Sequence, residues 1–274
     1  MRYRAADPSM EPQLRALWNR VFGDPEAYLD LFFRRCFDPA ETMVACEGDQ
    51  VRAMLYLLPL TLRAGAQAFS ARYVYAVATD PDFRSRGLST ALLEETHRAL
   101  AARGIAASVL VPAEPSLFAY YGARGYATAF WAESREIAPG EGEMIPLRET
   151  SLAAQKPLRD AWFSRCALYG EWDENALRYR EAETAFLGGK VFSFPTEKSH
   201  GYAVCVPVSD AVRITEFVGP ADTRVLRALA AAFGKPRVCM RAPAENGAPF
   251  AMLYPYRDLP VRPDRSAALT LVLD

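Results

Sequence analysis

The sequence has little of what metal sites and disulfide frameworks need. Its 274 residues include two histidines, His97 and His200, and five cysteines, none of them spaced as C-x-x-C. Two histidines this far apart cannot form an H-E-x-x-H zinc site, and an odd number of scattered cysteines argues against a zinc ribbon and against a set of disulfides. We therefore expect no bound metal and buried, reduced thiols, which is typical of a cytoplasmic protein.

A surplus of one charge and long apolar runs are lacking as well. Lys and Arg number 32 and Asp and Glu 33, which gives a net charge of −1. A basic nucleic-acid-binding surface needs an excess of Lys and Arg, and a membrane span needs about 18 or more consecutive apolar residues. Neither nucleic acid nor a membrane is therefore an expected partner. Apolar residues make up 51% of the chain, enough for the core of a globular protein.

Helix and strand patterns are mixed along both halves of the chain. Up to residue 137 they predict two amphipathic helices on either side of Gly23, a hairpin, a long strand ending near Thr79, a helix over residues 88–102, and then a strand, a short helix and a strand. Residues 138–146, APGEGEMIP, hold two prolines and two glycines and are the linker candidate. Beyond them the order of elements partly repeats and ends in a strand over residues 267–273. The predicted fold is α/β with a mixed sheet, in two domains, 1–137 and 138–274.

The most informative stretch connects the long strand to the helix after it. It reads DPDFRSRGLST, residues 80–90. Gly87 allows a ligand to approach the backbone closely, Ser89 is too small to block it, and the free N–H groups of the first helical turn point at the loop. These donors, the positive end of the helix dipole and the charges of Arg84 and Arg86 together favour an anion such as a pyrophosphate.

Other phosphate-binding and nucleophile motifs do not fit this stretch. It has neither the G-K-[ST] of a P-loop nor the G-x-G-x-x-G of a Rossmann fold. Residues 87–91, GLSTA, come near the G-x-S-x-G nucleophile elbow, but that elbow turns directly from strand to helix. Here eight residues separate Ala78 from Gly87, which argues against a serine hydrolase.

A second motif follows about 35 residues later, YGARGY over residues 121–126. The pair R-x-x-G-x-S (Arg84, Gly87, Ser89) and Y-x-x-x-G-Y resembles the GNAT N-acetyltransferases, whose two motifs are Q/R-x-x-G-x-G/A and Y-x-x-x-G-F/Y. The stretches YVYAVATDPDFRSRGL and AEPSLFAYYGARGYAT are most similar to the enhanced-intracellular-survival branch of tandem GNAT proteins. The chain is expected to lack the third, sterol-carrier-like domain of that branch.

The resemblance implies acetyl-CoA as co-substrate and assigns residues to it. The backbone of Ala76, Val77 and Ala78 would bond the pantetheine arm and the thioester carbonyl. The remaining implied binding residues are Arg84, Ser85, Arg86, Gly87, Leu88, Ser89, Ala113 and Glu114. Glu114 stands seven residues before Tyr121, where many members carry Asn. Tyr121 would protonate the departing CoA thiolate as general acid. Tyr120 is its rival, because adjacent residues of a helix point about 100° apart.

The base that deprotonates the amine is less well defined. Many members of the family carry a Glu in the central strand, and ARYVYAVAT has none. The similar branch is thought to use the chain's own C-terminal carboxylate, which makes Asp274 the candidate. Asp80 and Glu114, acting through water, are the alternatives.

The second half differs from the first at the decisive step. Its strand–helix segment EFVGPADTRVLRALAAAF has no arginine–glycine loop, and no Y-x-x-x-G-Y follows. We predict a degenerate GNAT-like domain that walls the acceptor site or forms an interface. The expected function is direct transfer of an acetyl group to a primary amine of a small molecule or peptide. The alternative is a non-catalytic acyl-CoA-binding sensor or scaffold. A homo-oligomer is left open.

Overall fold

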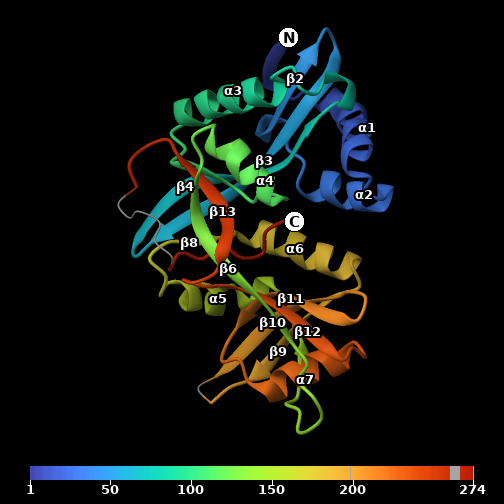
Figure 1. Cartoon of the computed structure of the whole chain (residues 1–274), viewed down its shortest axis with the longest axis vertical. Helices are drawn as coiled ribbons and strands as arrows, with labels where there is room; N and C mark the ends of the chain where they lie inside the picture. Colours follow the sequence, from blue (N-terminus) through green and yellow to red (C-terminus); the bar gives the residue numbers. More distant parts are fainter. Residues whose placement is uncertain (198, 260–265, 274) are drawn as a thin grey trace.

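The computed structural model describes residues 1–197, 199–259 and 266–273. Within these residues the strands form one mixed sheet in the order β1-β2-β3-β4-β5-β13-β6-β12-β11-β10-β9-β7, with β8 paired to β3. Figure 1 shows the first half of the chain at one end of the molecule and the second half at the other, with β6 and β13 running between them. The predicted mixed α/β class is confirmed.

The first half places helices around a hairpin and a long central strand. Its helices and strands are β1 (Arg2–Ala5), α1 (Glu11–Phe22), α2 (Glu26–Arg35), β2 (Thr42–Glu47), β3 (Gln50–Ala64), β4 (Gln67–Thr79), α3 (Leu88–Ala102), β5 (Ala107–Leu110), α4 (Pro115–Gly122) and β6 (Ala127–Ile137). Helix α1 buries Leu14, Leu17 and Trp18 at helical spacing. It ends at Gly23, which takes the left-handed conformation (φ 72°) that an L side chain disfavours.

The second half repeats this order in part. Its helices and strands are β7 (Arg148–Glu149), α5 (Lys156–Phe163), β8 (Tyr169–Glu171), α6 (Glu174–Phe186), β9 (Lys190–Pro195), β10 (His200–Pro207), β11 (Ala211–Val218), α7 (Thr223–Ala232), β12 (Arg237–Pro243) and β13 (Ala248–Pro255). Strands β9, β10 and β11 are antiparallel, and α7 then leads to β12, which is parallel to β11. The same arrangement joins β2, β3 and β4 through α3 to β5.

Two strands carry the sheet across the middle of the chain. Strand β13, from the second half, pairs with both β5 and β6 of the first. Strand β6 also pairs with β12 through residues 132–137. The boundary predicted at residue 137 stays a prediction, and the two parts share hydrogen-bonded strands on either side of it.

Three groups of buried side chains stabilise this arrangement. One packs α3 and α4 against the first half of the sheet, and another packs α7 against the second half. The largest lies between the halves, where α1, α2 and α6 and residues 267–273 meet strands β3 and β4. Helices α2 and α6 are in contact there, and the ring of Trp172 packs on Tyr73 of β4, so the second half reaches the central strand of the first.

The structure corrects the last predicted strand and shows a further strand that was not predicted. The strand expected over residues 267–273 is not regular. Its side chains are buried, but among its described residues only Ala268 forms a β-bridge, to Tyr169. Leu271 has a positive φ of 55°, and side chains rather than a neighbouring strand bond several of its carbonyl groups. Strand β13 was not predicted, because Pro249 and Pro255 near its ends hide the pattern.

Candidate functional site

The central strand β4 is distorted where the site begins. Its residues 71–73 pair with β5, and beyond Tyr73 the two strands are no longer paired. On the other edge, Tyr75 faces Tyr56 and Ala78 faces Met54, so β4 holds one more residue than β3. Ala76 lies in this bulge with a positive φ of 46°. A bulge leaves backbone polar groups without a partner strand, which suits a site where a ligand bonds the backbone.

The loop after β4 ends at an open helix N-terminus. A short 3-10 turn, Pro81–Phe83, follows the strand, and Ser85 and Gly87 then take left-handed conformations with φ of 60° and 76°. Gly87 precedes α3, whose first turn carries neither a side-chain cap nor an acidic residue. The first N–H groups of α3 are therefore free of side-chain acceptors, and with the helix dipole they form an anion-binding site.

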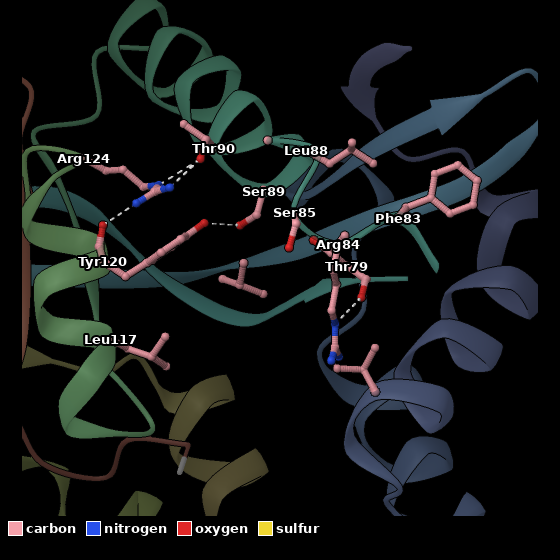
Figure 2. A pocket seen from close by; sticks show the side chains of 13 residues that line it. Thr79, Phe83, Arg84, Ser85, Leu88, Ser89, Thr90, Leu117, Tyr120 and Arg124 are labelled. Atoms are coloured by element: carbon pink, nitrogen blue, oxygen red, sulfur yellow. Dashed lines mark hydrogen bonds between the residues drawn. The ribbon is translucent and has the colours of Figure 1, made fainter. Parts of the chain in front are cut away.

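A cavity of about 460 Å³ opens at this turn between α1, β4, α3 and α4 (Figure 2). Its lining consists of Val21, Val77, Thr79, Phe83, Arg84, Ser85, Gly87, Leu88, Ser89, Thr90, Leu117, Tyr120 and Arg124. Six of the predicted binding residues are thus brought together: Val77, Arg84, Ser85, Gly87, Leu88 and Ser89. A site wide enough for a chain-like ligand is formed beside the anion-binding turn.

Two arginines give the cavity a positive lining. The Nε atom of Arg84 donates to the Thr79 carbonyl oxygen at 3.5 Å, as Figure 2 shows. Arg124 donates to the Thr90 hydroxyl, at 2.6 and 3.1 Å, and to the Tyr120 carbonyl oxygen, and its guanidinium lies 3.4 Å from the centre of the Tyr120 ring. Arg86 points elsewhere, since it bonds the Asp82 carbonyl and lies over Phe83.

The two candidate tyrosines of α4 lie in different surroundings. Tyr120 lines the cavity and donates to the Ser89 hydroxyl at 2.9 Å. Tyr121 is 8% exposed and packs with Leu88, Leu92 and Tyr126, and within the described residues its hydroxyl has no hydrogen-bond partner. Burial raises the pKa of Tyr121 to about 12. Its phenol therefore stays protonated at neutral pH, with a proton not committed to a protein acceptor.

The other predicted residues lie around the cavity rather than in its lining. Ala76 and Ala78 belong to the bulged strand, and Ala113 and Glu114 are exposed just ahead of α4. Asp80 is 4% exposed, and its two carboxylate oxygens bond the guanidinium groups of Arg20 and Arg52, at 2.7 and 3.2 Å. Both oxygens of this carboxylate are therefore already engaged by arginine N–H groups.

Asp274 lies outside the described residues, so its role as base stays a prediction. The residues before it approach β4. The Tyr73 hydroxyl donates to the Leu273 carbonyl oxygen at 3.0 Å, and Arg180 donates to the Val272 carbonyl oxygen at 2.6 Å. Residues 267–273 are all buried. The segment therefore runs between the two halves, beside the central strand.

Several lining residues were not predicted from the sequence. Arg124 lies inside the Y-x-x-x-G-Y motif, in the turn just after α4. Its position seven residues after Leu117 and four after Tyr120 is the signal that places all three on the same side. Val21 comes from α1, far away in the sequence, and no local pattern indicates it.

No helix in the described part of the chain is long and apolar enough to cross a membrane.

Comparisons with known proteins agree with the fold. Residues 2–129 match the family model of the acetyltransferase (GNAT) domain. The structure is similar to a GCN5-related N-acetyltransferase from Anabaena variabilis, at 17% identity and a TM-score of 0.73, over 93% of this chain and 73% of that one. It is also similar to a probable N-acyltransferase from Enterococcus faecalis (15% identity, 92% and 72% covered, TM-score 0.70). A third similar structure is Eis1 from Mycobacterium abscessus, at 15% identity and a TM-score of 0.64, over 93% of this chain and 74% of that one. The sequence matches no curated protein.

Proposed function

Because residues 2–129 match the family model of the GNAT acetyltransferase domain, we propose that this protein moves an acetyl group directly from acetyl-CoA to a primary amine. The observation that carries the proposal is the uncapped N-terminus of α3 beside the bulge of β4, with the cavity between them. Free helix N–H groups and Arg84 suit a pyrophosphate. The unpaired backbone around Ala76 suits the amide groups of a pantetheine arm.

Within this proposal Tyr121 is the general acid. The attacking nitrogen forms a bond to the thioester carbonyl carbon, the C–S bond breaks, and the sulfur takes the phenolic proton of Tyr121. A phenol that is buried and bonded to no protein acceptor suits this role. Tyr120 already donates its proton to Ser89 and forms the wall of the cavity.

Calorimetry with acetyl-CoA tests the cofactor part of the proposal. We expect binding by the wild type and none by Gly87→Trp, whose indole would fill the cavity mouth. Gly234→Trp is the matched control, because Gly234 has a similar positive φ (62°) with nothing within 4 Å of an added Cβ, but lies in the second half. A wild type that does not bind millimolar acetyl-CoA contradicts the proposal.

The two tyrosines are separated by steady-state kinetics in a thiol-release assay with a panel of primary amines. Tyr121→Phe should lower kcat about 100-fold at unchanged affinity for acetyl-CoA, which is the usual scale of general acid catalysis. Tyr120→Phe should mainly weaken acetyl-CoA binding. Because the pKa of Tyr121 is about 12, no loss of activity from its ionisation is expected up to about pH 10. The reverse pattern between the two variants would make Tyr120 the acid.

If the wild type binds acetyl-CoA but transfers to no amine of the panel, so that Tyr121→Phe has nothing to change, the protein is instead a non-catalytic acyl-CoA-binding sensor or scaffold.

A further inference from the structure

A chain of hydrogen bonds links the second half of the protein to the central strand of the first. The hydroxyl of Tyr28, on α2, donates to Oε1 of Glu183, on α6, at 2.8 Å. The hydroxyl of Tyr75, on β4, lies 3.1 Å from that of Tyr28. Since Tyr28 has one proton and gives it to Glu183, Tyr75 is the donor in this second bond. The lone pairs of the Tyr75 oxygen then remain available to accept a proton.

The chain ends beside the proposed reaction site. Tyr75 directly precedes Ala76 in the bulge, and Val77 lines the cavity. The Tyr75 ring also contacts Trp18 of α1, at 5.6 Å between ring centres, and Val21 one turn further along α1 lines the cavity too. Glu183 and Tyr28 are nearly inaccessible, at 7% and 9% exposure, whereas Tyr75 is only partly buried. Of the three residues, Tyr75 is the least buried and is next to the bulge in sequence, so we take it as the one that meets the bound amine.

Among the described residues, five titratable groups surround Glu183. They are Arg180 and Tyr179 of its own helix, Tyr28 of α2, Cys36 at the end of α2, and Tyr75 of β4. Arg180 bonds the second oxygen of Glu183, so the carboxylate keeps a counter-ion. Burial raises the pKa of the Tyr28 and Tyr75 phenols well above their usual range. Both phenols are therefore neutral and can move a proton only by giving one up as they receive another.

From this geometry we propose that Glu183 is the proton acceptor of the transfer reaction and that Tyr75 and Tyr28 relay the proton to it. The inference rests on the proposed acetyl transfer. An ammonium nitrogen near the bulge gives a proton to the Tyr75 oxygen, Tyr75 gives its own to Tyr28, and Tyr28 gives its own to Oε1 of Glu183. The neutral nitrogen then attacks the carbonyl carbon. The nitrogen then loses its second proton to the Tyr121 phenolate, which is left when Tyr121 protonates the sulfur, and Glu183 returns its proton to solvent.

The relay would explain how a chain without a central-strand glutamate deprotonates an amine. Asp80, the nearest carboxylate in sequence, is bonded to two arginines. Glu114 is exposed at the start of α4 and accepts from Ser116 at 3.4 Å. Glu183 comes from the other half of the chain, so it assigns that half a part in the chemistry.

The test compares Glu183→Gln, Tyr28→Phe and Tyr75→Phe with Tyr179→Phe. Gln retains the acceptor oxygen for Tyr28 but cannot take a proton. Tyr179 is the matched control, because its hydroxyl lies 3.5 Å from that of Tyr28 and is outside the relay. Transfer to the best amine of the panel is measured from pH 6 to pH 10, together with acceptor-free hydrolysis of acetyl-CoA, in which the attacking water also loses a proton.

Glu183→Gln should lower kcat/KM about 100-fold at pH 7 and leave the affinity for acetyl-CoA unchanged. Because only the neutral amine then reacts, its rate should rise about tenfold per pH unit and approach the wild-type rate near the pKa of the amine. Tyr28→Phe and Tyr75→Phe should share this profile, and Tyr179→Phe should keep the wild-type one. A structural defect would instead lower the rate equally at every pH.

Two results overturn the relay. One is a Glu183→Gln variant with the wild-type rate and pH profile. The other is a loss in Tyr179→Phe equal to that in Tyr28→Phe. If the wild type transfers to no amine, the proposed function fails, and hydrolysis decides the relay by the same comparison. A wild type without either reaction excludes both.

Discussion

The two halves of the chain build the same strand–turn–helix unit and finish it differently. Strand β4 has an extra residue in its pairing with β3, and β11 has one, Thr215, in its pairing with β10. Each strand continues into a helix and then a parallel strand. In the first half the helix begins at Gly87 without a side-chain cap. In the second, the Asp222 carboxylate accepts from the Arg224 N–H at 2.8 Å and so occupies the place of an anion. A helix N-terminus is thus a ligand site only where the sequence leaves its donors free.

The side chains near each bulge differ in the same way. In the first half Tyr75 is partly exposed and belongs to the proposed relay. In the second half Glu216 is fully buried, 3.1 Å from Nε of Arg159, and also accepts from Tyr202 and Thr270. The second half has therefore filled the corresponding region with its own ion pair. This fits a domain that supports the structure of the first half rather than one that binds a ligand at its own bulge.

The largest effect is expected from breaking that ion pair. Arg159→Met leaves the Glu216 carboxylate buried without its cation, and removal of one partner of such a pair costs about 3–5 kcal/mol of unfolding free energy. Unfolding in denaturant measures this loss of free energy. Arg178→Met is the control, because Arg178 pairs with Glu174 on the surface and should change stability by less than about 1 kcal/mol.

The double variant Arg159→Met, Glu216→Leu should recover most of the loss, since no unpaired charge remains. If Arg159→Met alone is as stable as the wild type, the ion pair is not what holds the second half together, and the contrast with the first half loses its basis.

The sequence carried the information for most of the fold, because its signals are local. Gly23 and Gly87 mark helix boundaries through positive φ, and the β-branched and aromatic run of β4 marks the central strand. The place of β13 between β5 and β6 could not be predicted, because it depends on pairing across more than a hundred residues. Residues 267–273 are apolar enough to be a strand, but their carbonyl groups are bonded by Trp172, Arg180 and Tyr73 instead.

A second prediction converts the helix start of the first half into that of the second. Gly87→Asp places a carboxylate at the start of α3, as Asp222 does for α7. We expect it to weaken acetyl-CoA binding about 100-fold, or roughly 2.7 kcal/mol, through repulsion of the pyrophosphate. Gly87→Asn is the matched control, because Asn has the same shape, tolerates a positive φ and carries no charge.

Calorimetry at low and high salt separates charge from shape in these variants. The difference between Asp and Asn should shrink as salt screens the carboxylate. Equal losses in both variants, independent of salt, would mean that the turn binds by shape alone and that the cap of α7 is no obstacle to an anion.

The candidate site was predictable only where a motif is contiguous. Arg84, Gly87 and Ser89 lie within six residues, and the structure brings them to one cavity. Glu183 had no such signal, since it lies in a helix of the other half and reaches β4 only through Tyr28. Side chains that meet through tertiary packing of distant elements leave no local pattern in a sequence.

The smallest effect is expected at the cap of α7. Asp222→Ala removes the acceptor of the Arg224 N–H and should lower Tm slightly, and Asp222→Asn, which retains an acceptor oxygen, should lower it less.

The hydrogen bonds from Arg224 lower the pKa of Asp222 below 3.8. A group with a lowered pKa in the folded state stabilises the protein above its unfolded pKa, and this contribution is lost as the pH falls through the folded one. The difference in Tm between the wild type and Asp222→Asn should therefore be constant from pH 7 to about pH 5 and shrink as the pH falls below 3.8. Neither variant should change the affinity for acetyl-CoA, because α7 does not line the cavity. If Asp222→Ala instead binds a second equivalent of acetyl-CoA, the carboxylate was the main obstacle in the second half, and the two halves differ by one side chain rather than by a filled interior.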